Sequence, residues 1–428
     1  MRIALISAIV IFLSGCFPDT DKNISESRQQ SEYQSFTISC DRDTIIQDTN
    51  GIKIRIRANT FTCDKDNTVK IGFSTILSKY EMIINNIYTI DEKGRFLETG
   101  GMFRIVNLSN DEDKFREAIT LEIPANYIND RMSKYLLEQS DEGISYWVNS
   151  NEILETKGTD GLFRGRELYN ANCASCHSKN MREVLTGPAL GNIHLFRGGD
   201  WLIEFTKNSQ KMIVENDSIA LCLWQAWGPT LMNSYEYLSD EEIKDIYEFI
   251  ANESSVQNIG LEEIKYVTEC DITPLDVVDT FNFDSLVIIQ GEPFLQPLNA
   301  YRYLIDITSS SWVNADFLSS FEDEIDPIAV KLNEQYENIS MVLVFENRDI
   351  AVPFVFEEDS NLYRLWHPLK KDKISFPLGE RVKIITVVDH EKFKYNILDY
   401  QPKEKDNFIS IELEEGEEEE FLELLKKL

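Results

Sequence analysis

Cys173-Ala174-Ser175-Cys176-His177 is the stretch that decides the fold in the middle of this chain. Its two thiols lie about one helical turn apart, and an imidazole follows the second thiol directly. Each thiol can therefore add to one vinyl group of a single porphyrin, while the imidazole ligates the iron of the same ring. The motif predicts a helical region that holds haem c covalently, with one haem because the sequence contains one such motif.

A C-x-x-C pair is also compatible with a zinc site or with a redox-active dithiol, and both stay open at this point. A structural zinc site needs a second ligand pair at a regular spacing, and the sequence offers none. A thioredoxin-like redox pair needs the two thiols but gives His177 no role. Haem attachment uses all three side chains, so it is the interpretation that we carry forward.

The first residues predict export and a lipid anchor. Arg2 precedes an apolar run over residues 3–13, which is too short to span a bilayer but suits the core of a signal peptide. The run ends in Leu13-Ser14-Gly15-Cys16, which resembles a bacterial lipobox, although an ordinary signal peptide with a chance cysteine is the alternative. We expect a signal peptide over residues 1–15, a lipidated Cys16 and a flexible stalk over residues 16–35.

The N-terminal residues predict where the protein is located, and the net charge of the chain limits its partners. A body on a lipid tether belongs to the envelope of a Gram-negative bacterium, facing the periplasm or the surface. Phe17 stands where an Asp would favour the inner membrane, so we prefer the outer membrane. The chain holds 42 Lys and Arg against 74 Asp and Glu, a net charge of -32, which argues against binding nucleic acid. The expected partner is a redox protein that the sequence does not identify.

Four further cysteines are candidates for disulfides in an oxidising compartment. Their proximity within the expected domains favours Cys40 with Cys63, and Cys222 with Cys270. Four cysteines allow three pairings, and free buried thiols are the alternative.

The hydrophobic pattern divides the chain into three domains. Ile52, Ile54 and Ile56 alternate with basic residues, a period of two that is typical of strands, and predict a β-sandwich over residues 36–150. Residues 155–255 are expected to form an all-α domain around the haem motif. Strand-like runs then predict a β-rich C-terminal domain over residues 271–428, closed by a helix after the acidic run Glu417 to Glu420.

Helical spacing connects the haem motif to its flanks. Apolar or small residues lead up to Cys173 at helical intervals, and Ser239 with Glu242 forms a capping box for a second helix. The first group is Leu162, Gly165, Leu168 and Tyr169, and the second helix carries Ile243, Ile246, Tyr247 and Ile250 on one face.

This order of parts resembles the class I c-type cytochromes over roughly residues 160–252. The resemblance implies that the first and last helices cross at Gly165 and Phe249. It implies that the carbonyl of Pro188 accepts the imidazole N–H of the iron ligand His177. It also implies that Met232, in the loop before the last helix, is the second axial ligand of the iron.

Alternative second ligands stay open, because Asn233 stands where the family usually has a proline after the methionine. His194 is one alternative, and Met212 and Met181 are two more. The apolar residues expected to line the porphyrin are Leu185, Leu190, Ile193, Phe196, Trp201, Leu202 and Phe205.

The resemblance implies one-electron transfer in which Cys173 and Cys176 hold the haem, and His177 and Met232 fill both axial positions. With no open coordination position, we expect no catalysis at this iron. Two alternative functions stay open: an envelope assembly or binding lipoprotein whose cytochrome connects the β-domains to a redox partner, and a haem enzyme or sensor. The segment 164–211 has a formal charge of +3, which could pair with haem propionates or dock an acidic partner.

Overall fold

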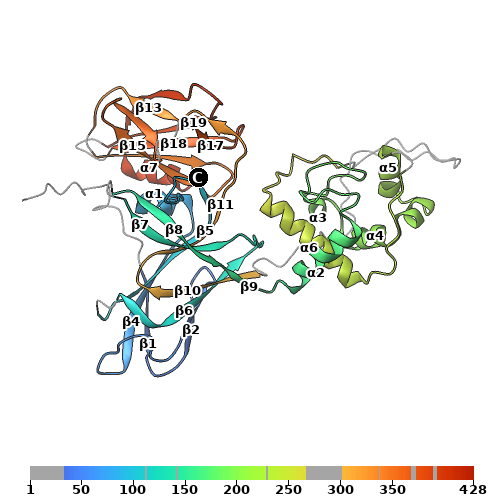
Figure 1. Cartoon of the computed structure of the whole chain (residues 1–428), viewed down its shortest axis with the longest axis horizontal. Helices are drawn as coiled ribbons and strands as arrows, with labels where there is room; N and C mark the ends of the chain where they lie inside the picture. The colour runs from blue at the N-terminus through green and yellow to red at the C-terminus, as the bar shows by residue number, and fades with distance from the viewer. Residues whose placement is uncertain are drawn as a thin grey trace, which may run out of the picture.

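A computed structural model describes residues 33–110, 113–140, 143–227, 230–266, 301–336, 338–367, 373–388 and 393–428. The expected signal peptide, Cys16 and most of the expected stalk lie outside these residues, as does Cys270. The chain forms β-rich N-terminal and C-terminal regions and a helical region, α2–α6, that is central in the sequence. In Figure 1 the two β-rich regions lie together and the helices lie to one side of them. Among the described helices, none is long and apolar enough to cross a membrane.

The N-terminal β-rich region consists of two sheets, which we call the β platform. One sheet has the order β1 (Gln34–Ser39), β4 (Thr68–Ile76), β5 (Leu97–Asn107), β11 (Val313–Leu318), β7 (Ser133–Gln139) and β8 (Ser145–Ile153). The other has the order β2 (Thr44–Gln47), β3 (Lys53–Ile56), β6 (Lys114–Ala125), β10 (Tyr301–Ser309) and β9 (Glu155–Lys157). Helix α1 (Lys79–Asn85) follows β4.

The predicted alternation around β3 is confirmed, because Ile52, Ile54 and Ile56 are buried while Arg55 is exposed. Residues from both sheets pack into one hydrophobic core, since every second side chain of a strand points to the same face.

The expected domain boundaries do not coincide with the regions that the strand pairing defines. β10 and β11, which the sequence pattern assigns to the C-terminal domain over residues 271–428, pair with β6 and β9 and with β5 and β7. β9, which the pattern assigns to the helical domain over residues 155–255, also belongs to the β platform. Period-two patterns identify strands but do not say which distant strand each one joins, so the predicted boundaries are wrong at these strands.

The helical region is an insertion between β9 and β10. It contains α2 (Asp160–Asn172), α3 (Ile193–Phe196), α4 (Gly199–Val214), α5 (Ser218–Ala226) and α6 (Asp240–Val256). α2 and α6 pack against each other at Gly165, where an added β-carbon would lie 1.9 Å from the backbone oxygen of Asp245. The ring of Phe249 lies 5.3 Å from that of Tyr169 at this crossing, as the resemblance implied. The predicted capping box of Ser239 and Glu242 begins α6.

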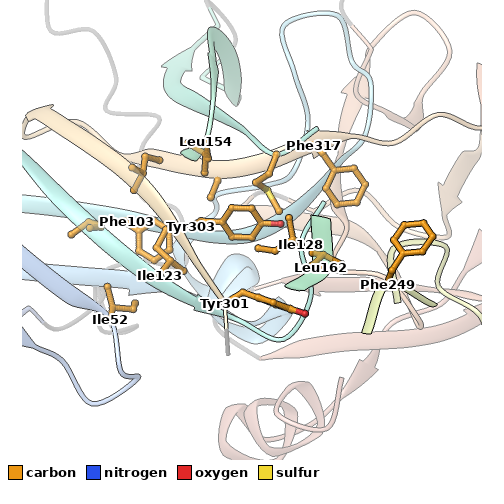
Figure 2. Packing of buried hydrophobic residues seen from close by; sticks show 14 of the residues in the cluster. Ile52, Phe103, Ile123, Ile128, Leu154, Leu162, Phe249, Tyr301, Tyr303 and Phe317 are labelled. Carbon is orange, nitrogen blue, oxygen red and sulfur yellow. The ribbon is translucent and has the colours of Figure 1, made fainter. Parts of the chain in front are cut away.

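A buried polar contact attaches α6 to the β platform, and an exposed ion pair attaches α2. The side chain of Asn252 accepts a hydrogen bond from the Ile128 N–H at 2.6 Å and donates one to the Ile128 carbonyl at 2.9 Å. Arg166 pairs with Asp130 at 3.2 Å. Figure 2 shows Leu162 of α2 near Ile128 and Tyr301, which are side chains of the β platform. The helical domain is therefore anchored to the platform by packing as well as by the chain.

The C-terminal region is one eight-stranded sheet with a closing helix. Its strand order is β20 (Phe408–Ile411), β13 (Ala329–Leu332), β16 (Leu362–Leu365), β15 (Ala351–Glu357), β14 (Ile339–Phe345), β18 (Val382–Val388), β19 (Lys394–Tyr400) and β21 (Glu414–Glu415). A short pair joins β12 (Glu324–Ile325) to β17 (Ile374–Ser375). β20 and β21 are consecutive in the chain yet lie at opposite ends of this order, so the sheet curls round on itself. The predicted closing helix is α7 (Glu418–Leu425), which buries Phe421 and Leu425.

Candidate functional site

The haem motif lies on a tight turn at the end of α2. Cys173 follows the last residue of the helix, and the backbone N–H groups of Cys176 and His177 both donate to its carbonyl at 3.0 Å. The hydroxyl of the buried Tyr169 donates to the carbonyl of Ser178 at 2.8 Å. These contacts hold both thiols and the imidazole in one short, ordered turn.

The imidazole of His177 is oriented from behind by the segment after the motif. Its Nδ1 lies 2.8 Å from the carbonyl oxygen of Pro188. A carbonyl can only accept, so Nδ1 carries the hydrogen and Nε2 keeps a free lone pair. Burial lowers the pKa of His177, which favours the neutral imidazole that a metal needs. The hydrogen bond to Pro188 is the one that the resemblance implied.

Gly187 leaves space for the imidazole ring of His177, because glycine has no side chain. A β-carbon on Gly187 would lie 2.6 Å from Cε1 of His177, so any larger residue would push the ring away. The N–H of Gly187 also donates to the carbonyl of Cys176 at 2.8 Å. The backbone around Gly187 therefore fixes both the position and the orientation of the imidazole.

A cavity of about 400 Å³ opens beside Cys173, Cys176 and His177. Its walls are mainly aliphatic and aromatic side chains. Five of the seven predicted lining residues are among them: Leu190, Ile193, Trp201, Leu202 and Phe205. The predictions for Leu185 and Phe196 are not matched, because neither contributes to the lining.

Met232 lines the same cavity as His177. Among the described residues that we considered as second ligands, Met212, Met181 and His194 do not line it. Met212 and Met181 are buried in the core of the region. Burial lowers the pKa of His194 to about 4, so its side chain is a neutral buried group. The structure thus brings Met232, and not the three alternatives, to the cavity of the haem motif.

The thiols do not have the properties of a thioredoxin-like redox pair. Cys173 and Cys176 are free, and burial, with a smaller contribution from Cys176, raises the pKa of the Cys173 thiol to about 12. Catalytic redox cysteines instead need a lowered pKa to form the thiolate. Elsewhere in the described ranges, no cluster of three His, Cys, Asp or Glu side chains is placed to hold a metal ion.

The donor set fits a covalently held haem. Two thiols and an imidazole flank an apolar cavity, and Gly187 leaves space against the ring that would ligate the iron. Cys173 and Cys176 would hold the porphyrin, and His177 would ligate its iron, with Met232 on the lining of the same cavity.

Most basic residues of segment 164–211 are already paired. Five of the seven form ion pairs with carboxylates: Arg164 with Asp245, Arg166 with Asp130, Arg182 with Glu263, Lys207 with Asp240 and Lys211 with Glu215. Arg197 instead is buried and lines the cavity. The positive segment is therefore mainly a set of local ion pairs.

The structure joins Cys40 to Cys63 in a disulfide, with a Cα–Cα distance of 6.3 Å. Cys222 in α5 is also disulfide-bonded. The cysteine that we expected opposite it, Cys270, lies outside the described residues.

Several cavity residues escaped prediction. Trp224 and Trp227 come from α5 and the turn after it, and Ile264 and Tyr266 come from the segment after α6. Leu223, Trp224 and Trp227 have the spacing of an apolar helix face, and this pattern could have predicted Trp224 and Trp227 as cavity residues. Ile264 and Tyr266 carry no such signal, because they belong to an irregular segment.

A helical domain with a C-x-x-C-H turn, a carbonyl-oriented histidine and an apolar cavity defines a haem c protein by its fold and site. Comparison with protein families agrees, because residues 163–254 match the family Cytochrome c. This part of the chain is a c-type cytochrome domain, a family whose members bind haem covalently and usually transfer electrons, although some are haem enzymes. No curated protein matches the chain.

Proposed function

We propose that this protein is a one-electron carrier with a single haem c, attached to Cys173 and Cys176 and ligated by His177 and Met232. The observation that carries the proposal is that His177 and Met232 line one apolar cavity, with Nε2 of the histidine left available by its bond to Pro188. When bound there, haem supplies reversible one-electron chemistry between the ferric and ferrous states.

The surrounding residues act on that chemistry without taking part in bond changes. The Pro188 carbonyl holds the His177 ring and raises its basicity. A methionine thioether favours the ferrous state relative to a second imidazole. The apolar lining keeps water out and so disfavours the extra positive charge of the ferric porphyrin core.

We propose a carrier rather than an enzyme, because two protein ligands leave no coordination position for a substrate. A haem enzyme or sensor is the alternative, and it requires an open position on the side of Met232.

A second candidate function concerns the β regions. They make up most of the chain, and the cytochrome domain is anchored to the β platform through the buried Asn252. This arrangement favours an envelope assembly or binding protein in which the cytochrome connects the β regions to a redox partner. Capture of a partner by the β regions without the helical domain would support it.

We further propose that the protein is a lipoprotein of the Gram-negative envelope, tethered through Cys16, with the outer membrane preferred. The support is the lipobox-like Leu13-Ser14-Gly15-Cys16 and the Cys40–Cys63 disulfide, which suits an oxidising compartment. Cys16→Ser is expected to release the protein from membranes or to leave its precursor uncleaved. A Cys16→Ser protein that stays membrane-bound after signal removal would contradict the tether.

The central test uses protein matured in a periplasm that can attach haem. We expect one haem per chain by intact mass and by haem staining of a denaturing gel, and a weak sulfur-to-iron band in the oxidised protein. Cys173→Ala or Cys176→Ala should leave one thioether bond or no stable holoprotein. Haem that acid-acetone extracts from the wild type would overturn the proposal, and binding of cyanide or carbon monoxide to the untreated protein would favour the enzyme or sensor.

A further inference from the structure

Residues 257–266, which we call the strap, follow α6 and lie beyond the residues that match the cytochrome c family. Arg182 clamps the strap to the segment after the haem motif. Its Nε donates to the Glu263 carboxylate at 2.9 Å, and its Nη2 donates to the carbonyls of Gln257 at 2.8 Å and Asn258 at 3.2 Å. One guanidinium thus holds both the start of the strap and its middle.

Two further contacts hold the strap against the same segment. The hydroxyl of Tyr266 donates to the carbonyl of Gly191 at 2.6 Å, and the side chain of the buried Asn192 donates to the carbonyl of Ile259 at 2.8 Å. The ring of Tyr266 also packs 5.1 Å from that of Phe196, measured between centroids. The strap is therefore fixed along its length by hydrogen bonds and by an aromatic contact.

The fixed strap forms one wall of the cavity. Ile264 and Tyr266 line it together with His177 and Pro188, and both strap side chains are half-buried. Val184 and Leu231 also line the cavity and are 58% and 44% exposed, so the cavity is open to solvent at these two side chains, which we call the mouth.

We propose that the strap shields one haem edge from water and so raises the reduction potential, leaving electron exchange to the mouth at Val184 and Leu231. The inference rests on the proposed function. Its physical basis is that the ferric porphyrin core carries a positive charge that the ferrous core lacks, and a wall that excludes water destabilises the charged form. Ile264 and Tyr266 act as positioning residues that set the environment of the haem.

The test compares two aliphatic residues of the strap in the full-length holoprotein. Ile264→Ala opens the wall, whereas Leu261→Ala alters a side chain that is 57% exposed and does not line the cavity. We expect Ile264→Ala to shift the reduction potential downward and to speed oxidation of the ferrous protein by ferricyanide severalfold, because water and reagent then reach a second edge. Leu261→Ala should leave both quantities at the wild-type values.

Equal potentials and equal oxidation rates in the two variants would overturn the role of the strap. If Ile264→Ala fails to retain haem, Tyr266→Ala gives the same test, because it removes the ring that lines the cavity and packs against Phe196. A downward shift of the potential in Tyr266→Ala supports the wall, and an unchanged potential overturns it. Failure of the proposed function is distinguishable, because it would appear in the wild type as absent haem attachment or an absent sulfur-to-iron band.

Discussion

Met232 is the residue on which the proposed carrier function depends most. It lines the cavity of the haem motif, whereas Met212 is buried in the core away from that cavity. We expect Met232→Ala to lose the sulfur-to-iron band, to lower the reduction potential and to admit cyanide, because the thioether that favours ferrous iron is gone. Optical spectra and potentiometry of the oxidised protein measure this.

Met212→Ala is the matched control, because it also truncates a methionine, but one whose side chain packs in the core. It should cost stability through the cavity that it leaves while keeping the band. If the band disappears in Met212→Ala and stays in Met232→Ala, Met212 is the ligand. A spectrum of two imidazoles in the wild type would instead point to His194.

At the scale of residues, the sequence predicts the covalent chemistry better than the environment around it. Cys173, Cys176 and His177 are adjacent, so their geometry follows from one turn of backbone. The Pro188 contact could be inferred only through the resemblance, because it spans an irregular loop. Ile264 and Tyr266 lacked any periodic signal, and only the fold brings them to the cavity.

Among the structural elements, strand β6 holds a buried carboxylate that connects three strands. Glu122 is 4% exposed and binds Arg55 of β3 at 2.5 Å and Lys157 of β9 at 2.6 Å. Its hydrogen bond to Arg55, with a further one to Lys157, lowers the pKa of Glu122 from 4.5 to about 2. Because the pKa is lower in the folded protein, this stabilisation is present above about pH 4.5 and is lost as the pH falls towards 2.

We therefore expect Glu122→Gln to lower the free energy of unfolding at neutral pH by about 2 kcal/mol, allowing for the exposure of its partners. The difference from the wild type should shrink between pH 4.5 and about 2. Urea unfolding at several pH values measures it. Glu117→Gln on the same strand is the control, because Glu117 forms an exposed pair with Arg57 at 3.9 Å. A pH-independent difference would show that Glu122 acts through packing rather than charge.

One face of helix α6 lines the cavity, and another part of the helix contacts the β platform. Ile246 and Ile250 line the cavity, and Asn252, which is 1% exposed, binds the backbone of Ile128. We expect Asn252→Ala to destabilise the protein by about 2–3 kcal/mol, because it leaves a buried N–H and C=O without a partner. Ser255→Ala, at an exposed site on the same helix, should change little. Denaturant midpoints compare the two, and equal midpoints would contradict a buried role for Asn252.

For the whole molecule, the sequence predicts the three regions but not how the chain threads through them. The regions were predicted because each has its own periodicity, two for strands and 3.6 for helices. The threading was not predicted, because β10 and β11 pair with strands far earlier in the chain and such pairing leaves no local pattern in the sequence. β10 lies between β6 and β9, and β11 lies between β5 and β7. Figure 1 shows β10 crossing within the β platform, far from the C-terminal sheet that follows it in the chain.

This threading makes a prediction about which pieces of the chain fold alone. Lys157 of β9 pairs with Arg302 of β10, so the two ends of the helical insertion leave from neighbouring antiparallel strands. A variant in which a short Gly-Ser linker replaces residues 158–300 should keep its β structure and unfold cooperatively, although it binds no haem. Uncovering Ile128 and Tyr301 should lower its midpoint, because both side chains are buried in the whole protein.

A variant that ends at residue 157 tests the same threading from the other direction. It lacks both β10 and β11, so each sheet loses an internal strand and exposes two unpaired edges. We expect this variant to aggregate or to unfold without a cooperative transition, as followed by circular dichroism. A cooperative transition at the midpoint of the linker variant would show that residues 301–318 are dispensable, and the β platform would then be an N-terminal domain of the kind that the sequence first indicated.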